Sequence, residues 1–191
     1  MNTGRLEAFS DGVMAVAITI MVLEVDVPQH TDLAALSHVV PELLTYALSF
    51  VYIGIYWSNH HHLLQAAERV SGPVLWANLH LLFWLTLIPM TTAWVGENYA
   101  SAWPTAIYGA VLLFAALAYF ILVRRFVALH GADSPLAQAI GRDAKNKISA
   151  VLYAAAIPLA FVHTAIADVL YVVVAVIWLV PDRRIESTLG W

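Results

Sequence analysis

Cysteine is absent from the 191 residues of the sequence. Its absence excludes disulfide bonds, thiol catalysis and thiolate metal sites. Charged residues are also scarce, at 12% against roughly 25% in an average soluble domain, while 61% of the residues are hydrophobic. The sequence therefore predicts an integral membrane protein built as one domain (residues 1–191) without internal repeats.

Motifs for common enzymatic and ion-binding functions are missing as well. The chain contains no Walker A motif, no GxGxxG loop, no TVGYG-type carbonyl filter and no GxSxG nucleophile elbow. We therefore expect no enzyme activity and no catalytic residue. The nine basic residues lie near the ends of hydrophobic segments and do not indicate nucleic-acid binding.

Six hydrophobic segments are predicted to cross the membrane, at about residues 6–27, 39–60, 74–95, 104–127, 147–163 and 166–180. Pro89 is expected to kink the third. The stretch 148–180 is too long for one span and short for two. Its polar residues His163 and Asp168 predict two short helices that meet near residues 164–168.

The basic residues decide the orientation. All nine Lys and Arg residues lie at alternate ends of the six segments. Six spans place every one of them in the cytoplasm, as the positive-inside rule requires, whereas five spans would place Arg183 and Arg184 outside. The prediction is an all-α six-span helical bundle with both termini cytoplasmic. Because the first segment lacks a signal-peptide cleavage pattern, we expect it to be a retained span.

The first segment, residues 5–24, is unusual because polar residues interrupt it. Such residues almost always face protein or water within a membrane, which predicts a central position for this segment in its bundle. At about 100° per residue, Val16, Ile20 and Leu23 form one apolar stripe, continued by Val13 and Val27. Periodicity alone favours the simpler interpretation of this stripe as ordinary bundle core.

Small residues, namely Gly12, Ala15 and Thr19, flank the stripe. Residues of this size allow the backbones of two helices to approach closely within a membrane.

The second segment ends in a polar tract, Tyr56-Trp57-Ser58-Asn59-His60-His61-His62. The three histidines point about 100° apart, so a regular helix cannot direct all of them at one metal ion, and we predict no metal site. A metal would need further ligands such as Asp11 or Glu7. We instead expect a structural hydrogen-bond network that consists of Arg5, Ser10, Asp11, Trp57, His60, His61 and Asn78. His80 is a further candidate for this network.

The motif Arg5-x-x-x-Phe9-Ser10-Asp11-Gly12-Val13 resembles the signature of the transmembrane protein 175 family of potassium channels. Further matching residues are Ala15-x-Ala17-Ile18-Thr19, Leu23-Glu24, Tyr56-Trp57-x-x-His60-His61, Asn78-Leu79 and Ile88-Pro89. The likeness covers the first three segments, whereas the last three agree only in hydropathy and length.

The resemblance implies a single-repeat bacterial channel of the inner membrane, a homotetramer in which the first helix lines the pore. It assigns the constriction to Val16, Ile20 and Leu23, with Val13, Thr19 and Val27 flanking. The family has a larger Ile or Leu at the first layer, where this chain has Val16. The implied function is weak selection of potassium over sodium, without a cofactor; the implied partners are other copies of the chain, monovalent cations and the lipid bilayer.

Other interpretations remain open at this point. One is a proton-conducting channel, and another is a secondary transporter, although no inverted repeat or pair of broken spans is visible. Further alternatives are a histidine-dependent membrane enzyme, a haem or metal protein using His60 to His62, and a non-conducting structural protein.

Overall fold

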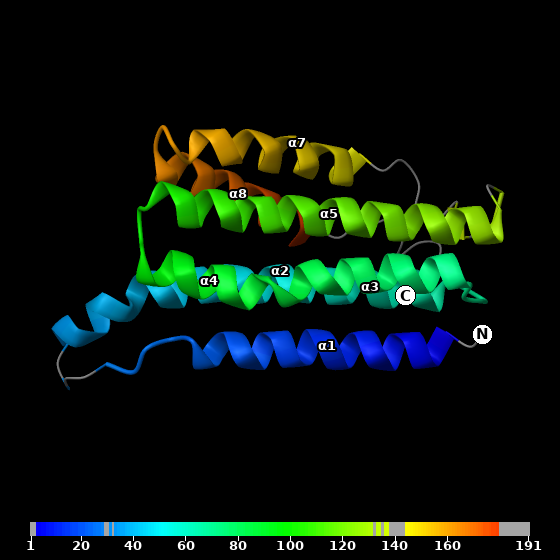
Figure 1. Cartoon of the computed structure of the whole chain (residues 1–191), viewed down its shortest axis with the longest axis horizontal. Helices are drawn as coiled ribbons and strands as arrows, with labels where there is room; N and C mark the ends of the chain where they lie inside the picture. The colour runs from blue at the N-terminus through cyan, green and yellow to red at the C-terminus, as the bar shows by residue number, and fades with distance from the viewer. Residues whose placement is uncertain are drawn as a thin grey trace.

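The computed structural model describes residues 3–28, 31, 33–131, 133, 134, 136, 137 and 144–179. Regular structure within these residues is entirely helical, which confirms the predicted fold class, and Figure 1 shows the long helices side by side in one elongated bundle. In chain order the helices are α1 (Thr3–Leu23), α2 (Leu33–Gln65), α3 (Gly72–Thr86), α4 (Ile88–Glu97), α5 (Ala102–His130), α7 (Ala144–Leu159) and α8 (Thr164–Leu179).

Among the described residues, four helical stretches are long and apolar enough to cross a bilayer, namely Thr3–Leu23, Val39–Gln65, Gly72–Glu97 and Ala102–His130. Helices α7 and α8 have 16 residues each and pack together as a hairpin. Residues 160–163 join them, slightly before the turn expected at 164–168.

The third hydrophobic stretch is broken into α3 and α4 at Leu87. Pro89 has no backbone N–H to donate to the carbonyl four residues earlier, so the helical hydrogen-bond ladder is interrupted there. The expected kink is therefore present, two residues before the proline. Pro41, by contrast, lies inside α2, which begins at Leu33, earlier than the predicted start of that span.

Helix α1 lies at one edge of the bundle, against α2, α3 and α4, whereas α7 lies at the opposite edge (Figure 1). The prediction that this segment is central in the bundle of its own chain is wrong. Helix α5 contributes more of the interior, with fourteen buried residues compared with five in α1. The polar residues of α1 can lie at the edge because neighbouring α2 and α3 supply their partners.

Tyrosine, serine and threonine side chains tie the remaining helices together through the interior. Ser49 and Tyr108 share a hydrogen bond of 2.9 Å between their hydroxyls, and the Thr92 hydroxyl donates to the Ser49 oxygen at 2.7 Å. The Tyr171 hydroxyl donates to the carbonyl of Thr105 at 3.0 Å. With no water in the bilayer core, each such group must find its partner inside the protein.

Gly109 on α5 makes room for one of these tyrosines. A Cβ atom at this position would overlap the hydroxyl and ring of Tyr171, whose side chain is fully buried. The close packing of α8 on α5 therefore depends on a residue without a side chain.

We expect Gly109→Ala to destabilise the protein by about 1–3 kcal/mol, because the added methyl group forces Tyr171 out of a packed interior. Gly54→Ala is the matched control, since a Cβ atom there has no neighbour within 4 Å. Thermal unfolding of both variants in detergent should show a lower transition temperature only for Gly109→Ala. Equal transition temperatures would contradict this account of the α5–α8 contact.

Candidate functional site

Helix α1 carries two apolar faces. One packs into the bundle through Leu6, Ser10, Met14, Ala17 and Met21, which recur every three or four residues and are all buried. This spacing is the pattern of a helix with one face on a protein core.

The stripe of Val16, Ile20 and Leu23 forms the other apolar face of α1. Their side chains are 55%, 44% and 80% exposed, whereas Met14 and Met21 on the packed face are 1% exposed. The interpretation of the stripe as ordinary core of the chain is therefore wrong. A single copy leaves this face uncovered.

The three residues predicted to flank the stripe differ from one another. Val13 is half-buried and packs against the core. Thr19 is exposed, and its hydroxyl donates to the backbone carbonyls of Ala15 and Val16 at 3.1 and 2.9 Å. Val27 lies four residues beyond the end of α1 at Leu23, so the expected helical continuation to residue 27 is wrong.

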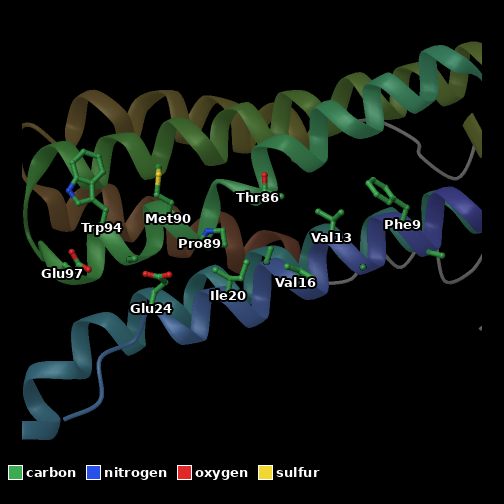
Figure 2. Close-up of a pocket in the computed structure, with 14 residues that line it drawn as sticks. Phe9, Val13, Val16, Ile20, Glu24, Thr86, Pro89, Met90, Trp94 and Glu97 are labelled. Carbon is green, nitrogen blue, oxygen red and sulfur yellow. The ribbon is translucent and has the colours of Figure 1, made fainter. Parts of the chain in front are cut away.

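A groove of about 870 Å³ runs along α1 and opens to the side of the molecule. Figure 2 shows α1 forming one wall and the end of α3 with α4 forming the other. Glu24 and Glu97 lie at one end of the groove. Its lining is mostly apolar and consists of Ala8, Phe9, Gly12, Val13, Val16, Ala17, Ile20, Glu24, Thr86, Pro89, Met90, Ala93, Trp94 and Glu97.

A buried chain of hydrogen bonds fixes α1 against α2 and α3. Asn78 Nδ2 donates to Ser10 Oγ at 2.9 Å, and Ser10 Oγ donates to the carbonyl of Leu6 at 2.8 Å. Asn78 Oδ1 lies 2.7 Å from His60 Nε2, and because the amide oxygen can only accept, His60 must donate from this nitrogen. Ser10, His60 and Asn78 are all fully buried, and every bond in the chain has a defined direction.

Two further contacts join α1 to α2 nearer the surface. Trp57 Nε1 donates to Asp11 Oδ1 at 3.0 Å, and His61 Nδ1 lies 2.9 Å from Glu7 Oε1. The rings of Trp57 and His61 stack at 5.8 Å, and Gln65 Nε2 approaches His61 Nε2 at 2.8 Å. Glu7 and Asp11 are four residues apart on α1, and Trp57 and His61 are four residues apart on α2. Because the two helices run antiparallel, Glu7 meets His61 and Asp11 meets Trp57.

Not every residue of the expected network takes part. The side chain of Arg5 is exposed and has no hydrogen bond or ion pair with another residue that the structure describes. His80 accepts a hydrogen bond from Trp84 at 3.0 Å on the same helix, away from α1. Glu7 and Gln65 are present instead. Their positions four residues from Asp11 and His61 were the signal in the sequence that could have identified them.

In the histidine tract, as in the rest of the part of the chain that the structure describes, no group of three or more His, Cys, Asp or Glu side chains is arranged to hold a metal ion. His60 and His62 each have a buried Nδ1 atom without a hydrogen-bond partner. The three neighbouring histidines point in different directions, as the helical geometry requires.

Comparisons with known proteins agree with this architecture. Residues 5–89 match the family model described as endosomal/lysosomal potassium channel TMEM175. A protein of Chryseobacterium sp. (strain P1-3) named as a potassium channel is 49% identical over 189 residues, which are 99% of this chain and 98% of that one. A human protein named endosomal/lysosomal proton channel TMEM175 is 36% identical over 87 residues, 38% of this chain and 17% of its own.

The fold is similar to a crystal structure described as a lysosomal potassium-selective channel TMEM175 homolog from Chamaesiphon minutus. The TM-score is 0.80 at 29% sequence identity, and the match covers 95% of this chain and 97% of that one. The similarity therefore extends beyond the first three spans, which carry the sequence motifs, to the whole helical bundle. The chain belongs to the TMEM175 family of membrane-embedded ion channels.

Proposed function

We propose that four copies of the chain surround a potassium-conducting pore, with α1 of each copy at the axis. Rings of Val16, Ile20 and Leu23 form the constriction. The observation that carries the proposal is the uncovered apolar stripe of α1, opposite the face that packs on α2, α3 and α4. Relatives that are named potassium channels support the choice of ion.

A pore between copies also agrees with the shape of a single chain. The large groove beside α1 is open along its side, so one copy does not enclose a path for an ion. Other helices also expose apolar residues, which lipid can cover at no cost. Helix α1 differs from them because its exposed face includes Gly12 and Thr19 and adjoins a groove, features that suit protein contact better than lipid.

An aliphatic constriction selects ions by the cost of removing water. Valine, isoleucine and leucine offer an ion no oxygen ligands, so any water lost in the ring is not replaced. Potassium holds its hydration shell less tightly than sodium and therefore meets a lower barrier. Selection of this kind is weaker than selection by a carbonyl filter, and a narrow apolar ring can also close by losing its water.

The polar contacts at the other face of α1 position the pore helix without touching ions. Asn78 links Ser10 on α1 to His60 on α2, and Trp57 holds Asp11. Ser10 and Asp11 lie on the sides of α1 that face α3 and α2, away from the exposed stripe. We infer that they are structural residues.

The orientation of the chain follows from the distribution of charge. Arg69 lies in the connector between α2 and α3, where its guanidinium donates to the carbonyl of Leu129 at 3.1 Å near the end of α5. Arg5 lies at the start of α1, and Figure 1 places that start at the same end of the bundle. Glu24 and Glu97 lie at the other end. The basic end is the cytoplasmic one under the positive-inside rule, and the chain is a multi-pass protein of the bacterial inner membrane.

Proton conduction is the second candidate function. The vertebrate relatives from Danio rerio and Homo sapiens are named proton channels. A proton can pass along a line of water molecules through a ring that is wet only intermittently, so the same constriction could serve both ions. Purified protein in liposomes separates the two functions, because potassium flux is measured at constant pH and proton flux without permeant metal cations.

We expect Ile20→Asn and Leu23→Asn to weaken the preference for potassium over sodium, or to raise conductance, because an amide in the ring lets the ion keep more of its hydration. Reversal potentials in reconstituted bilayers measure this preference. Leu117→Asn on the outer face of α5 is the matched control and should leave both quantities unchanged. If only the α5 variant altered them, α1 would be the wrong pore helix.

Both ends of the proposed topology can be labelled because the natural chain has no cysteine. We expect Tyr99→Cys, in the exposed connector before α5, to react with a membrane-impermeant maleimide on intact cells. Glu68→Cys, beside the start of α3, should react only after the membrane is opened. The reverse pattern would show that the orientation is inverted.

Asn78→Ala should destabilise the protein more than Asp11→Ala, because it removes the bonds of Asn78 to His60 Nε2 and Ser10 Oγ in a fully buried site and leaves Ser10 only its bond to the Leu6 carbonyl. A buried group that loses its partner costs about 1–3 kcal/mol. Asp11 and Trp57 lie nearer the surface, where water replaces a lost bond. Thermal unfolding should give this order while the potassium preference stays unchanged. A well-folded Asp11→Ala channel with inverted ion preference would instead place Asp11 in the pore.

A further inference from the structure

We propose that the groove between α1 and α4 holds the α1 helix of the neighbouring copy, which enters it with the flank that carries Gly12 and Thr19. The proposal rests on the proposed function, since it takes α1 to surround a fourfold axis. It adds which surface of one copy meets which surface of the next.

Ring geometry fixes the two directions in which α1 must meet its neighbours. When four equivalent helices stand around an axis, each neighbour lies about 45° to one side of the line from helix to axis. With Val16 facing the axis, a helical wheel at about 100° per residue places Val13 and Ile20 about 40–60° to one side. It places Gly12 and Thr19 about 40–60° to the other side. These are the two contact flanks of α1.

The first flank borders the groove. Val13 and Ile20 line it on α1, as does Gly12 of the other flank, whereas Thr19 does not. Figure 2 shows Pro89 and Met90 of α4 across from Ile20. The wall on both sides is apolar over this depth, and the two carboxylates, Glu24 and Glu97, lie only at its end. The groove therefore offers an incoming helix an apolar channel that runs alongside α1.

The second flank is shaped for close approach. A Cβ atom on Gly12 would have no neighbour within 4 Å in the single chain, so the space above it is open. Thr19 already donates its hydroxyl to backbone carbonyls of its own helix, and therefore needs no polar partner from a neighbour. Ala15 lies beside them. Small side chains of this kind allow helix backbones to pack tightly within a membrane.

The occupant of the groove is a second copy rather than a lipid chain because the pore must be sealed. A hydrocarbon chain lying between adjacent α1 helices would hold them apart and open a gap in each aliphatic ring. Because one flank of a copy meets a different flank of the next copy, the contact is heterologous. Heterologous contacts close into a ring when the rotation between copies divides a full turn evenly, as a quarter turn does for four copies. Every copy then supplies one groove and fills another.

Cysteine cross-linking tests the pairing directly, because the chain has no cysteine of its own. Thr19 lies at the same depth as Met90, because it adjoins Ile20, which is across the groove from Met90. Within one copy, however, Met90 lines the groove whereas Thr19 does not. In the Thr19→Cys, Met90→Cys double variant, mild oxidation should link copies into dimers, trimers and tetramers on a denaturing gel. Each single variant can link two copies at most, so it is the matched control. Thr19→Cys with Val151→Cys, on the exposed face of α7, should also form no ladder.

The outcomes separate this proposal from the proposed function. A tetrameric mass in detergent with intact potassium flux, but no ladder from the double variant, would overturn the pairing and leave the pore in place. Absence of a tetramer would overturn both. As a second measurement, Gly12→Phe should shift the mass from tetramer to monomer, whereas Ala154→Phe on the exposed side of α7 should not. Normal assembly of Gly12→Phe would also contradict the pairing.

Discussion

The hydrogen-bond chain from His60 through Asn78 to Ser10 is the interaction that sets the position of α1. All three side chains are fully buried, so water does not replace a missing partner there. Asn78 must donate to Ser10 and accept from His60, so a rotation of α1 by one residue would leave several groups unpaired. Apolar packing alone does not fix the rotation of a helix that is apolar on two faces. The polar contacts do.

The face that the helix presents outward follows from this constraint. With Ser10 turned toward α3 and Asp11 toward α2, the stripe of Val16, Ile20 and Leu23 has to point away from the chain. The exposed stripe and the buried network are thus one arrangement. A polar cluster near the start of the helix determines which apolar residues farther along it remain available for contact with ions or other copies.

Much of the fold could be predicted from the sequence because the membrane imposes simple rules. The shortage of charge, the six apolar segments and the RxxxFSD motif each indicated the fold or the family. The choice between the two faces of α1 could not be predicted by periodicity, since Met14 and Met21 on one face are as apolar as Ile20 and Leu23 on the other. Arg5 was expected in the network, but its side chain is exposed.

Helix ends were also beyond the reach of hydropathy. An apolar run predicts how much chain can enter a bilayer, yet it does not say where backbone hydrogen bonding stops. Helix α1 ends at Leu23 although Val25 and Val27 continue the apolar pattern, and α2 begins before its apolar region and includes Pro41. At Pro89 the missing backbone N–H interrupts the hydrogen-bond ladder, so that break was predictable, whereas Pro41 lies inside α2 without ending it. Residue type therefore predicted a helix end only at Pro89, where the missing backbone N–H removes a helical hydrogen bond.

In the proposed tetramer, the edge position of α1 within its own chain lets a small bundle line a pore. A helix in the centre of its own chain would have both faces covered and could not line a path for ions. At the edge, one face is satisfied within the copy while the other remains incomplete until further copies arrive. A central position for the first span, expected from its polar residues, is then reached only in the proposed tetramer. The single chain supplies the support for one wall of the pore, and the proposed symmetry supplies the other three.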